Sequence, residues 1–280
     1  MLKPEVYFLR YAYPCAKDLL GKSLKQEDID KMRNSVLENS PLPREYLEGI
    51  FKNAIKGMKK INASDYWSIE TIRAYFWIEH EKNLQHLEKM PMLKERCLVK
   101  RGKINEQLKH GFYKVQFTDG KTRNITLELL PEARLGDDVL VHRAHAVEKV
   151  YDKVNVYCFG NPHLSSDNLA MRLADKIELD GYTLMKCSSP DMIDTNLRPL
   201  VILDVVRNIK DVKIITDVNV LRQFNIVSTH DLDLGYHLNL LHELGELKDF
   251  TIIGIPPIAE EQTIEEKVKQ TLKELFPVHF

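Results

Sequence analysis

Three polar residues in the second half of the sequence each follow an apolar run, and together they have the side chains of a metal site. Asp167 closes the loop GNPHLSSD after the run VNVYCF, Asp204 ends the run LVILD, and His230 follows the run FNIVST. If these runs are strands of one open α/β sheet, their ends meet where such sheets bind ligands. Two carboxylates and one imidazole suit a borderline divalent ion such as nickel or zinc, with positions left open for substrate.

Each of the three residues also has a simpler structural explanation. An aspartate at a strand end is commonly a turn former or a helix cap, and a single histidine is commonly a hydrogen-bonded surface or core group. The set points to metal binding because the expected topology brings all three to one crevice. No serine or cysteine has the context of a catalytic nucleophile, and Cys158 lies inside a strand pattern.

Strands and helices that would position these residues alternate from Val154 onward. The apolar runs predict strands, and the amphipathic stretches LAMRLADKIEL, GYHLNLLHELG and TIEEKVKQTLKELF predict helices between them. Continuous apolar strands alternating with helices are typical of an α/β fold whose mostly parallel sheet is covered on both faces. We expect this domain to span residues 151–280.

Two segments with other patterns precede that domain. Residues 1–94 repeat apolar positions three or four apart, which predicts a helical domain. Residues 95–150 alternate apolar and polar positions, and Asp119-Gly120 between two such runs is typical of a hairpin turn. These short strands predict a small, OB-like β-barrel.

Composition sets limits on partners and location. The 280 residues are 44% hydrophobic and 29% charged, and a net charge of -1 provides no field that would attract nucleic acid or an anionic membrane. No apolar stretch approaches the roughly 20 residues that span a bilayer, and the first residues lack the order of a signal peptide. The four cysteines are scattered, which predicts reduced thiols. Packing is the role expected for Cys15 beside Pro14, and a second thiol site is the alternative. We expect a cytoplasmic protein.

The stretch GNPHLSSDNLAMRLADKI resembles the opening loop and helix of the HycI/HybD-like hydrogenase maturation proteases. The resemblance continues through Asp204, STHDLDLGYHLNLLHELGEL and FTIIGIPP. It implies a three-layer α/β sandwich and a nickel-dependent endopeptidase that removes a C-terminal peptide from the large-subunit precursor of a NiFe hydrogenase. It further implies that Asp167, Asp204 and His230 bind nickel supplied by that substrate. Ser166 replaces the usual first acid and Asn168 the usual glycine, so a non-catalytic scaffold that binds the precursor or senses nickel is the alternative.

The barrel segment, with CLVKRGKI and LLPEARLGDDVLVHRAHAVEKV, is similar to the HypC/HupF hydrogenase assembly chaperones. That resemblance implies an iron centre at Cys97 and a HypD-like maturation factor as a partner. If exposed, the Cys97 thiol would have a lowered pKa beside Lys94, Arg96 and Lys100; the alternative is a small buried apolar residue that begins a strand. Both families serve NiFe-hydrogenase maturation, so we expect the barrel to dock the precursor that the α/β domain cleaves.

Overall fold

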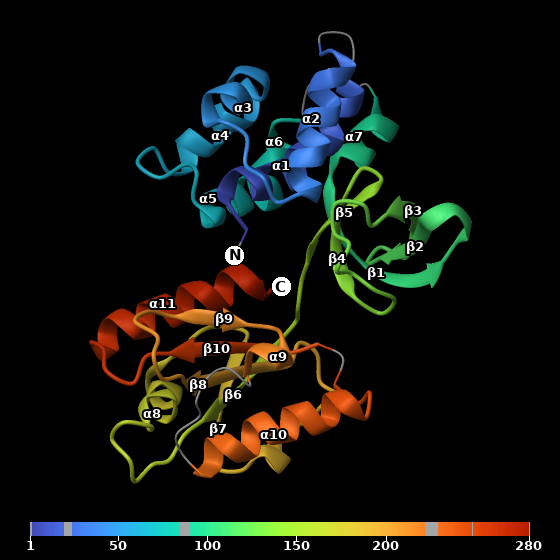
Figure 1. Ribbon diagram of the computed structural model, residues 1–280. Helices are drawn as coiled ribbons and strands as arrows, with labels where there is room; N and C mark the ends of the chain where they lie inside the picture. The colour runs from blue at the N-terminus through green and yellow to red at the C-terminus, as the bar shows by residue number, and fades with distance from the viewer. Residues whose placement is uncertain (1, 20–23, 85–89, 222–228, 248, 280) are drawn as a thin grey trace. The chain divides into compact units, whose positions relative to one another are not determined.

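The computed structural model describes residues 2–19, 24–84, 90–221, 229–247 and 249–279. They form two compact units, unit 1 (Met1–Val150) and unit 2 (Tyr151–Phe280), shown in Figure 1. Within the described ranges, no helix is long and apolar enough to cross a membrane. The finer division of unit 1 into residues 1–94 and 95–150 stays a prediction.

Unit 1 begins with the predicted helices. Phe51 interrupts the helical stretch 44–61, and a π-helix, η1 (Tyr75–Glu79), interrupts the stretch 69–82. Aromatic side chains pack in the core of unit 1: Phe8 contacts Phe51, Trp67 and Phe76 through ring–ring pairs. The helices are α1 (Pro4–Leu19), α2 (Gln26–Leu37), α3 (Arg44–Ile50), α4 (Lys52–Ile61), α5 (Ile69–Ala74), α6 (His80–Lys82) and α7 (Pro91–Cys97).

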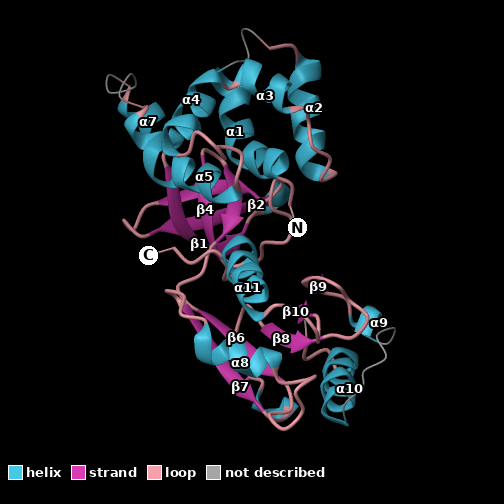
Figure 2. Ribbon diagram, turned by 90° about the vertical axis from the view of Figure 1, so that its left-hand side faces the viewer, coloured by secondary structure: helices cyan, strands magenta, loops and turns pink. Residues whose placement is uncertain are grey.

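Five strands follow in unit 1, and Figure 2 shows them beside the helices. Their hydrogen-bonded order is β1-β2-β3-β5-β4, and β4 pairs again with β1, so the pairings close into a ring. The predicted Asp119-Gly120 hairpin joins β2 to β3, with Gly120 at φ +78°. Closure into the expected barrel depends on one β3–β5 pair, Thr126 with His145. The strands are β1 (Val99–Gln107), β2 (Phe112–Phe117), β3 (Thr122–Thr126), β4 (Asp138–His142) and β5 (His145–Lys149).

A buried polar network joins the helices of unit 1 to its sheet. Glu148 of β5 pairs with Arg73 of α5 at 2.8 Å and accepts hydrogen bonds from the hydroxyls of Tyr7 (2.8 Å) and Tyr11 (2.5 Å). Both charged side chains are about one-tenth exposed or less. Because a buried charge without a partner is strongly destabilising, this pairing fixes how the helices and strands of unit 1 pack.

Unit 2 has the predicted alternation of strands and helices. Its sheet has the order β7-β6-β8-β10-β9, in which only the edge strand β9 is antiparallel. The strands are β6 (Val154–Phe159), β7 (Tyr182–Cys187), β8 (Val201–Val205), β9 (Lys213–Ile215) and β10 (Thr251–Ile255). The helices are α8 (Leu169–Lys176), α9 (Val218–Leu221), α10 (Thr229–Glu243) and α11 (Glu261–Leu275), with a 3-10 turn, η4 (Pro190–Met192).

Two hydrophobic clusters cover opposite faces of the unit 2 sheet. Alternate strand residues such as Val201 and Leu203 pack with α8 and α11. The intervening residues, such as Ile202, pack with α10. Figure 1 shows α11 and α10 on opposite sides of the strands. Unit 2 is therefore a mostly parallel sheet covered by helices on both faces.

The two ends of unit 2 are hydrogen-bonded to each other. The Tyr151 N–H donates to the Pro277 carbonyl at 3.0 Å, and the His279 N–H donates to the Tyr151 carbonyl at 3.0 Å. These bonds add a parallel bridge beside the sheet, and the Tyr151 ring also contacts Phe276 at a centroid distance of 6.0 Å.

Candidate functional site

Asp204 lies near the carboxyl end of the central strand β8. It pairs with Gly254 of β10, while the residue before it, Leu203, pairs with Cys158 of β6. Since side chains alternate along a strand, Asp204 points to the same face as Ile202, which is the face that α10 covers. The side chain is buried, at 7% exposure, and its Oδ1 accepts a hydrogen bond from the Val205 N–H at 2.8 Å.

Asp167 reaches the same edge of the sheet because the loop after β6 folds back on itself. The Asn161 N–H donates to Asp167 Oδ2 at 3.0 Å and to the Asp167 carbonyl at 3.1 Å. This fold of the loop brings the Asp167 carbonyl so close to Gly160 that a Cβ at position 160 would lie 2.2 Å from the carbonyl oxygen. Gly160 also has a positive φ of +152°. A loop of this shape therefore requires glycine at position 160, and it buries the Asp167 side chain to 6% exposure.

His230 lies in the first turn of α10, and its side chain is outside the described residues. The predicted strand FNIVST also falls largely outside them, since residues 222–228 are not described. α10 packs on the sheet and leads into β10 through a short connection. A helix in that position runs back antiparallel to the strand that follows it, so it begins near the carboxyl end of that strand. The backbone position of His230 is thus at the edge where Asp167 and Asp204 lie.

The two departures from the protease pattern have different structural consequences. Asn168 precedes α8 with φ -107°, so its backbone has no need of glycine, and its Oδ1 accepts a hydrogen bond from Arg172 Nη1 at 2.8 Å. Ser166 is exposed and removes one negative charge from the loop. The loss of the glycine therefore leaves the backbone here unstrained, while the loss of the acid changes the charge of the loop.

The cysteines of unit 2 are poor candidates for nucleophiles. Burial raises the pKa of Cys158, in β6, far above that of a free thiol, and burial raises the pKa of Cys187, in β7, to about 11. A thiol is nucleophilic as the thiolate, so neither side chain is activated at neutral pH. This agrees with the expectation that the reaction does not use a cysteine nucleophile.

Cys97 is placed differently from the exposed thiol that would have a lowered pKa. It is the last residue of α7, its side chain is fully buried, and it packs with Leu84, Leu93 and Leu98. This is the environment of a small apolar residue. An iron centre at Cys97 stays a prediction that this environment does not favour.

Unit 2 is thus an α/β domain with two buried carboxylates at the carboxyl edge of its sheet, the edge at which such sheets bind ligands. Residues 179–278 match the family model described as HycI: Hydrogenase maturation protease. Residues 179–278 of unit 2 are therefore similar to the hydrogenase maturation proteases, and the match covers 100 of the 280 residues. Asp204 and His230 lie within the matched residues, Asp167 precedes them, and unit 1 lies outside the match.

Several solved structures are similar to part of the chain. The hydrogenase maturating endopeptidase HybD from E. coli is 18% identical, with 44% of this chain and 93% of that one covered and a TM-score of 0.34. HybD from Thermococcus kodakarensis is 16% identical (44% and 98% covered, TM-score 0.35), and a hydrogenase 3 maturation protease is 21% identical (46% and 92% covered, TM-score 0.35). The comparison with curated proteins gives no match. At these identities and TM-scores the solved structures carry no argument, and the similarity to the protease family rests on the family match.

Proposed function

We propose that unit 2 is a nickel-dependent endopeptidase that removes a C-terminal peptide from the large-subunit precursor of a NiFe hydrogenase. The observation that carries this proposal is the burial of two carboxylates, Asp167 and Asp204, at the carboxyl edge of neighbouring parallel strands in a domain of this protease family. Buried carboxylates are retained where they are hydrogen-bonded, paired or bound to a metal.

In this proposal Asp167, Asp204 and His230 bind the nickel ion that the precursor brings with it. The chain would thereby select a precursor that already carries its metal. Two acidic oxygens and one imidazole leave further coordination positions to groups of the substrate. A metal ion held next to a peptide bond polarises its carbonyl or activates a water molecule, and no thiol nucleophile is needed.

The alternative is a non-catalytic scaffold that binds the precursor or senses nickel at the same edge. The exposed Ser166 in place of an acid favours this alternative, because the loop carries one charge fewer. The backbone of Asn168 does not favour it. Both readings predict nickel binding by Asp167 and Asp204, and they differ in whether a peptide is released.

Intact-mass measurement of a nickel-loaded precursor incubated with the full chain separates the two readings. We expect loss of one defined C-terminal peptide with the unmodified chain. Asp204→Asn should slow that loss more than about 100-fold, since changes even to outer partners of metal ligands cost about 10- to 100-fold. Asp180→Asn is the matched control, because Asp180 is exposed and outside the site. An uncleaved precursor that still co-purifies with the chain would replace the endopeptidase with the scaffold.

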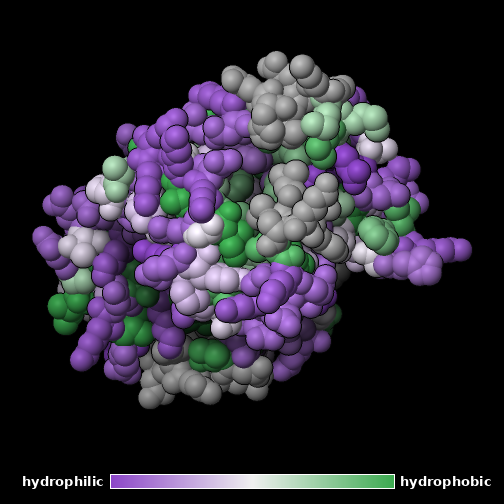
Figure 3. Space-filling model, turned by 90° about the horizontal axis from the view of Figure 1, so that it is seen from above, coloured by the Kyte–Doolittle hydropathy of each residue, from purple (hydrophilic) through white to green (hydrophobic). Residues whose placement is uncertain are grey.

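A docking role for residues 95–150, with a HypD-like factor as a further partner, is a separate part of the proposal. Its support is the sequence resemblance alone, since the family match lies within unit 2. The face of the molecule in Figure 3 is dominated by hydrophilic residues, with apolar residues in separate patches among those described there. The exposed apolar side chains of this segment, Phe112 and Leu135, are the first to substitute in a precursor-binding assay.

A further inference from the structure

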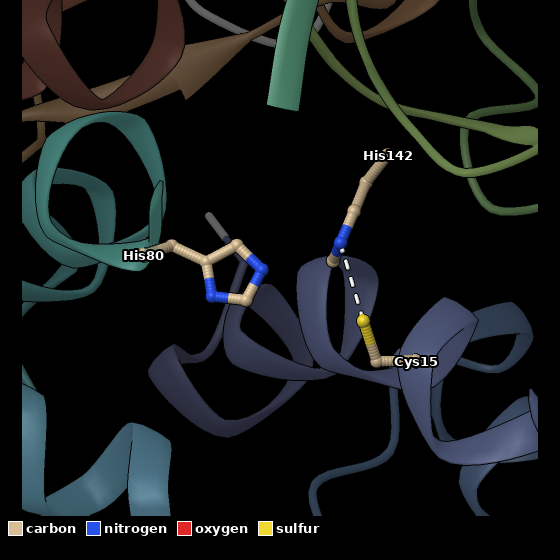
Figure 4. A group of neighbouring side chains, drawn as sticks. All are labelled: Cys15, His80 and His142. Atoms are coloured by element: carbon tan, nitrogen blue, oxygen red, sulfur yellow. Dashed lines mark hydrogen bonds between the residues drawn. The ribbon is translucent and has the colours of Figure 1, made fainter. Parts of the chain in front are cut away.

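Unit 1 brings together a second set of metal-binding side chains, unrelated to the carboxyl edge of unit 2. Cys15 comes from α1, His80 from α6 and His142 from β4, and Figure 4 shows them around a common space. One ligand atom from each lies within 4.8 Å of the others. We propose that Cys15, His80 and His142 bind one divalent transition-metal ion of borderline softness, such as zinc.

His142 is held in the form that a metal ligand needs. Its Nδ1 lies 2.7 Å from the Tyr11 carbonyl, and because a carbonyl only accepts, Nδ1 carries the proton. The ring is fully buried, and burial disfavours a charged imidazole. The ring is therefore neutral, and Nε2 presents a lone pair. A backbone carbonyl that fixes the far nitrogen is the usual support of a metal-binding histidine.

That lone pair faces the thiol of Cys15. The distance from Cys15 Sγ to His142 Nε2 is 3.2 Å. In a tetrahedral zinc site, bond lengths of about 2.3 Å to sulfur and about 2.0 Å to nitrogen separate the two ligand atoms by about 3.5 Å. The observed pair is close to that separation. Pro14, just before Cys15, removes one backbone donor from α1.

A hydrogen bond between Cys15 and His142 would not explain the buried ring of His80. Both of its ring nitrogens are buried, and within the described part of the chain neither makes a hydrogen bond of normal geometry, since a contact with the Cys97 backbone falls short of one. Buried polar atoms without partners are rare and costly. A metal ion between His80 and His142, whose ring centroids are 5.2 Å apart, would satisfy one of these nitrogens.

The π-helix η1 ends at Glu79, directly before His80. A π-helical turn inserts an extra residue into a helix and is frequent at functional sites, where it redirects the side chains that follow. Here it determines which face of the helix carries His80. The insertion is thus a second local feature that aims a side chain at this cluster.

The donor set determines the class of ion. One thiolate and two imidazoles select zinc and similar ions over magnesium and calcium, which prefer oxygen. Three protein ligands leave a fourth position open, and Cys15 is only partly buried. The site therefore suits an ion that exchanges or receives a further ligand. It is independent of the nickel that the hydrogenase precursor would bring to unit 2.

Titration of the full chain with Co(II), a spectroscopic substitute for zinc, tests the proposal. We expect one equivalent to bind with a thiolate-to-cobalt charge-transfer band. Cys15→Ser should abolish the band and His80→Gln should weaken binding at least tenfold, whereas the surface control His163→Asn should change neither. Asp204→Asn should leave the cobalt band unchanged, and Cys15→Ser should leave cleavage of the precursor unchanged. Failure of the metal site in unit 1 can then be distinguished from failure of the protease site in unit 2. A band that survives in Cys15→Ser would overturn the proposal.

A second measurement uses the unmodified protein and avoids any effect of substitution on folding. Alkylation of Cys15 is followed by peptide mass spectrometry with and without zinc. At a free zinc concentration about 10 times the Kd, mass action leaves about one-eleventh of the sites empty, so alkylation should slow about tenfold. Equal alkylation rates at every zinc concentration up to millimolar would contradict the assignment of Cys15 as a ligand.

Discussion

Replacement of Gly160 by alanine is the most direct test of how the loop after β6 positions Asp167. The loop returns so tightly that a Cβ at position 160 would lie 2.2 Å from the Asp167 carbonyl oxygen, and the next nearest atoms, 3.4 and 3.6 Å away, also belong to the backbone of residues 167 and 168. No flexible side chain can move aside to accept the methyl group. The change must therefore displace the backbone that carries the proposed ligand.

The size of that displacement follows from the contact. Real Cβ atoms essentially never come within 3.0 Å of such an atom, so the Asp167 carbonyl must move by at least about 0.8 Å. Misplacement of a reacting group by about 1 Å costs about 100-fold in rate. The crowding itself should reduce the free energy of unfolding of unit 2 by about 1–3 kcal/mol. We therefore expect a folded protein with about 1% of the cleavage rate.

The assay is intact-mass measurement of nickel-loaded precursor, with circular dichroism to follow unfolding. Gly245→Ala is the matched control: Gly245 also has a positive φ, +73°, but no atom lies within 4 Å of its would-be Cβ. That variant should lose about 1–2 kcal/mol from backbone strain and keep its cleavage rate. If Gly160→Ala cleaves as fast as the unmodified chain, the loop does not position Asp167 for the reaction, and the argument from its geometry is wrong.

Three further predictions concern burial. Glu148→Ala leaves Arg73 without its buried carboxylate and should lower the free energy of unfolding of unit 1 by about 3–5 kcal/mol. Urea denaturation followed by tryptophan fluorescence measures this loss, because both tryptophans lie in unit 1. Native Cys187, with a pKa of about 11, should be only about 0.1% thiolate at pH 8. It should therefore react with iodoacetamide more than about 100-fold more slowly in the folded than in the unfolded protein. Similar rates in the two states would show that the thiol is accessible in the folded protein. Gly102→Ala, whose Cβ would lie 2.8 Å from the backbone of the neighbouring strand, should destabilise unit 1 by about 1–3 kcal/mol, whereas Gly49→Ala, with no atom within 4 Å, should not.

Much of unit 2 was predictable because its pattern is local. Continuous apolar runs identify β6, β8 and β10, and three-to-four spacing identifies α8 and α11, so the covered sheet follows from sequence alone. The edge strand β9 was missed, since three residues flanked by polar ones carry little periodic signal. The burial of Asp167 and Asp204 at one edge agrees with the predicted crevice, and their roles as ligands stay a prediction with that of His230.

The cluster in unit 1 was beyond prediction for a physical reason. Cys15, His80 and His142 come from three elements and are separated by more than 60 positions along the chain. Nothing in their spacing resembles a metal motif, so only tertiary packing brings them together. The environment of Cys97 was equally hidden, because the burial of its side chain depends on packing with Leu84, which lies 13 positions earlier in the chain.

The hydrogen bonds between Tyr151 and residues 277–279 affect the order in which the protein is made. Unit 2 cannot complete its fold until these late residues have left the ribosome, whereas unit 1 is fully synthesised 130 residues earlier. At about 5–20 residues per second, that interval is roughly 7–26 s. Throughout it, the nascent chain carries a finished unit 1 and an incomplete unit 2, so the metal cluster of unit 1 can fill before the carboxyl edge of unit 2 exists.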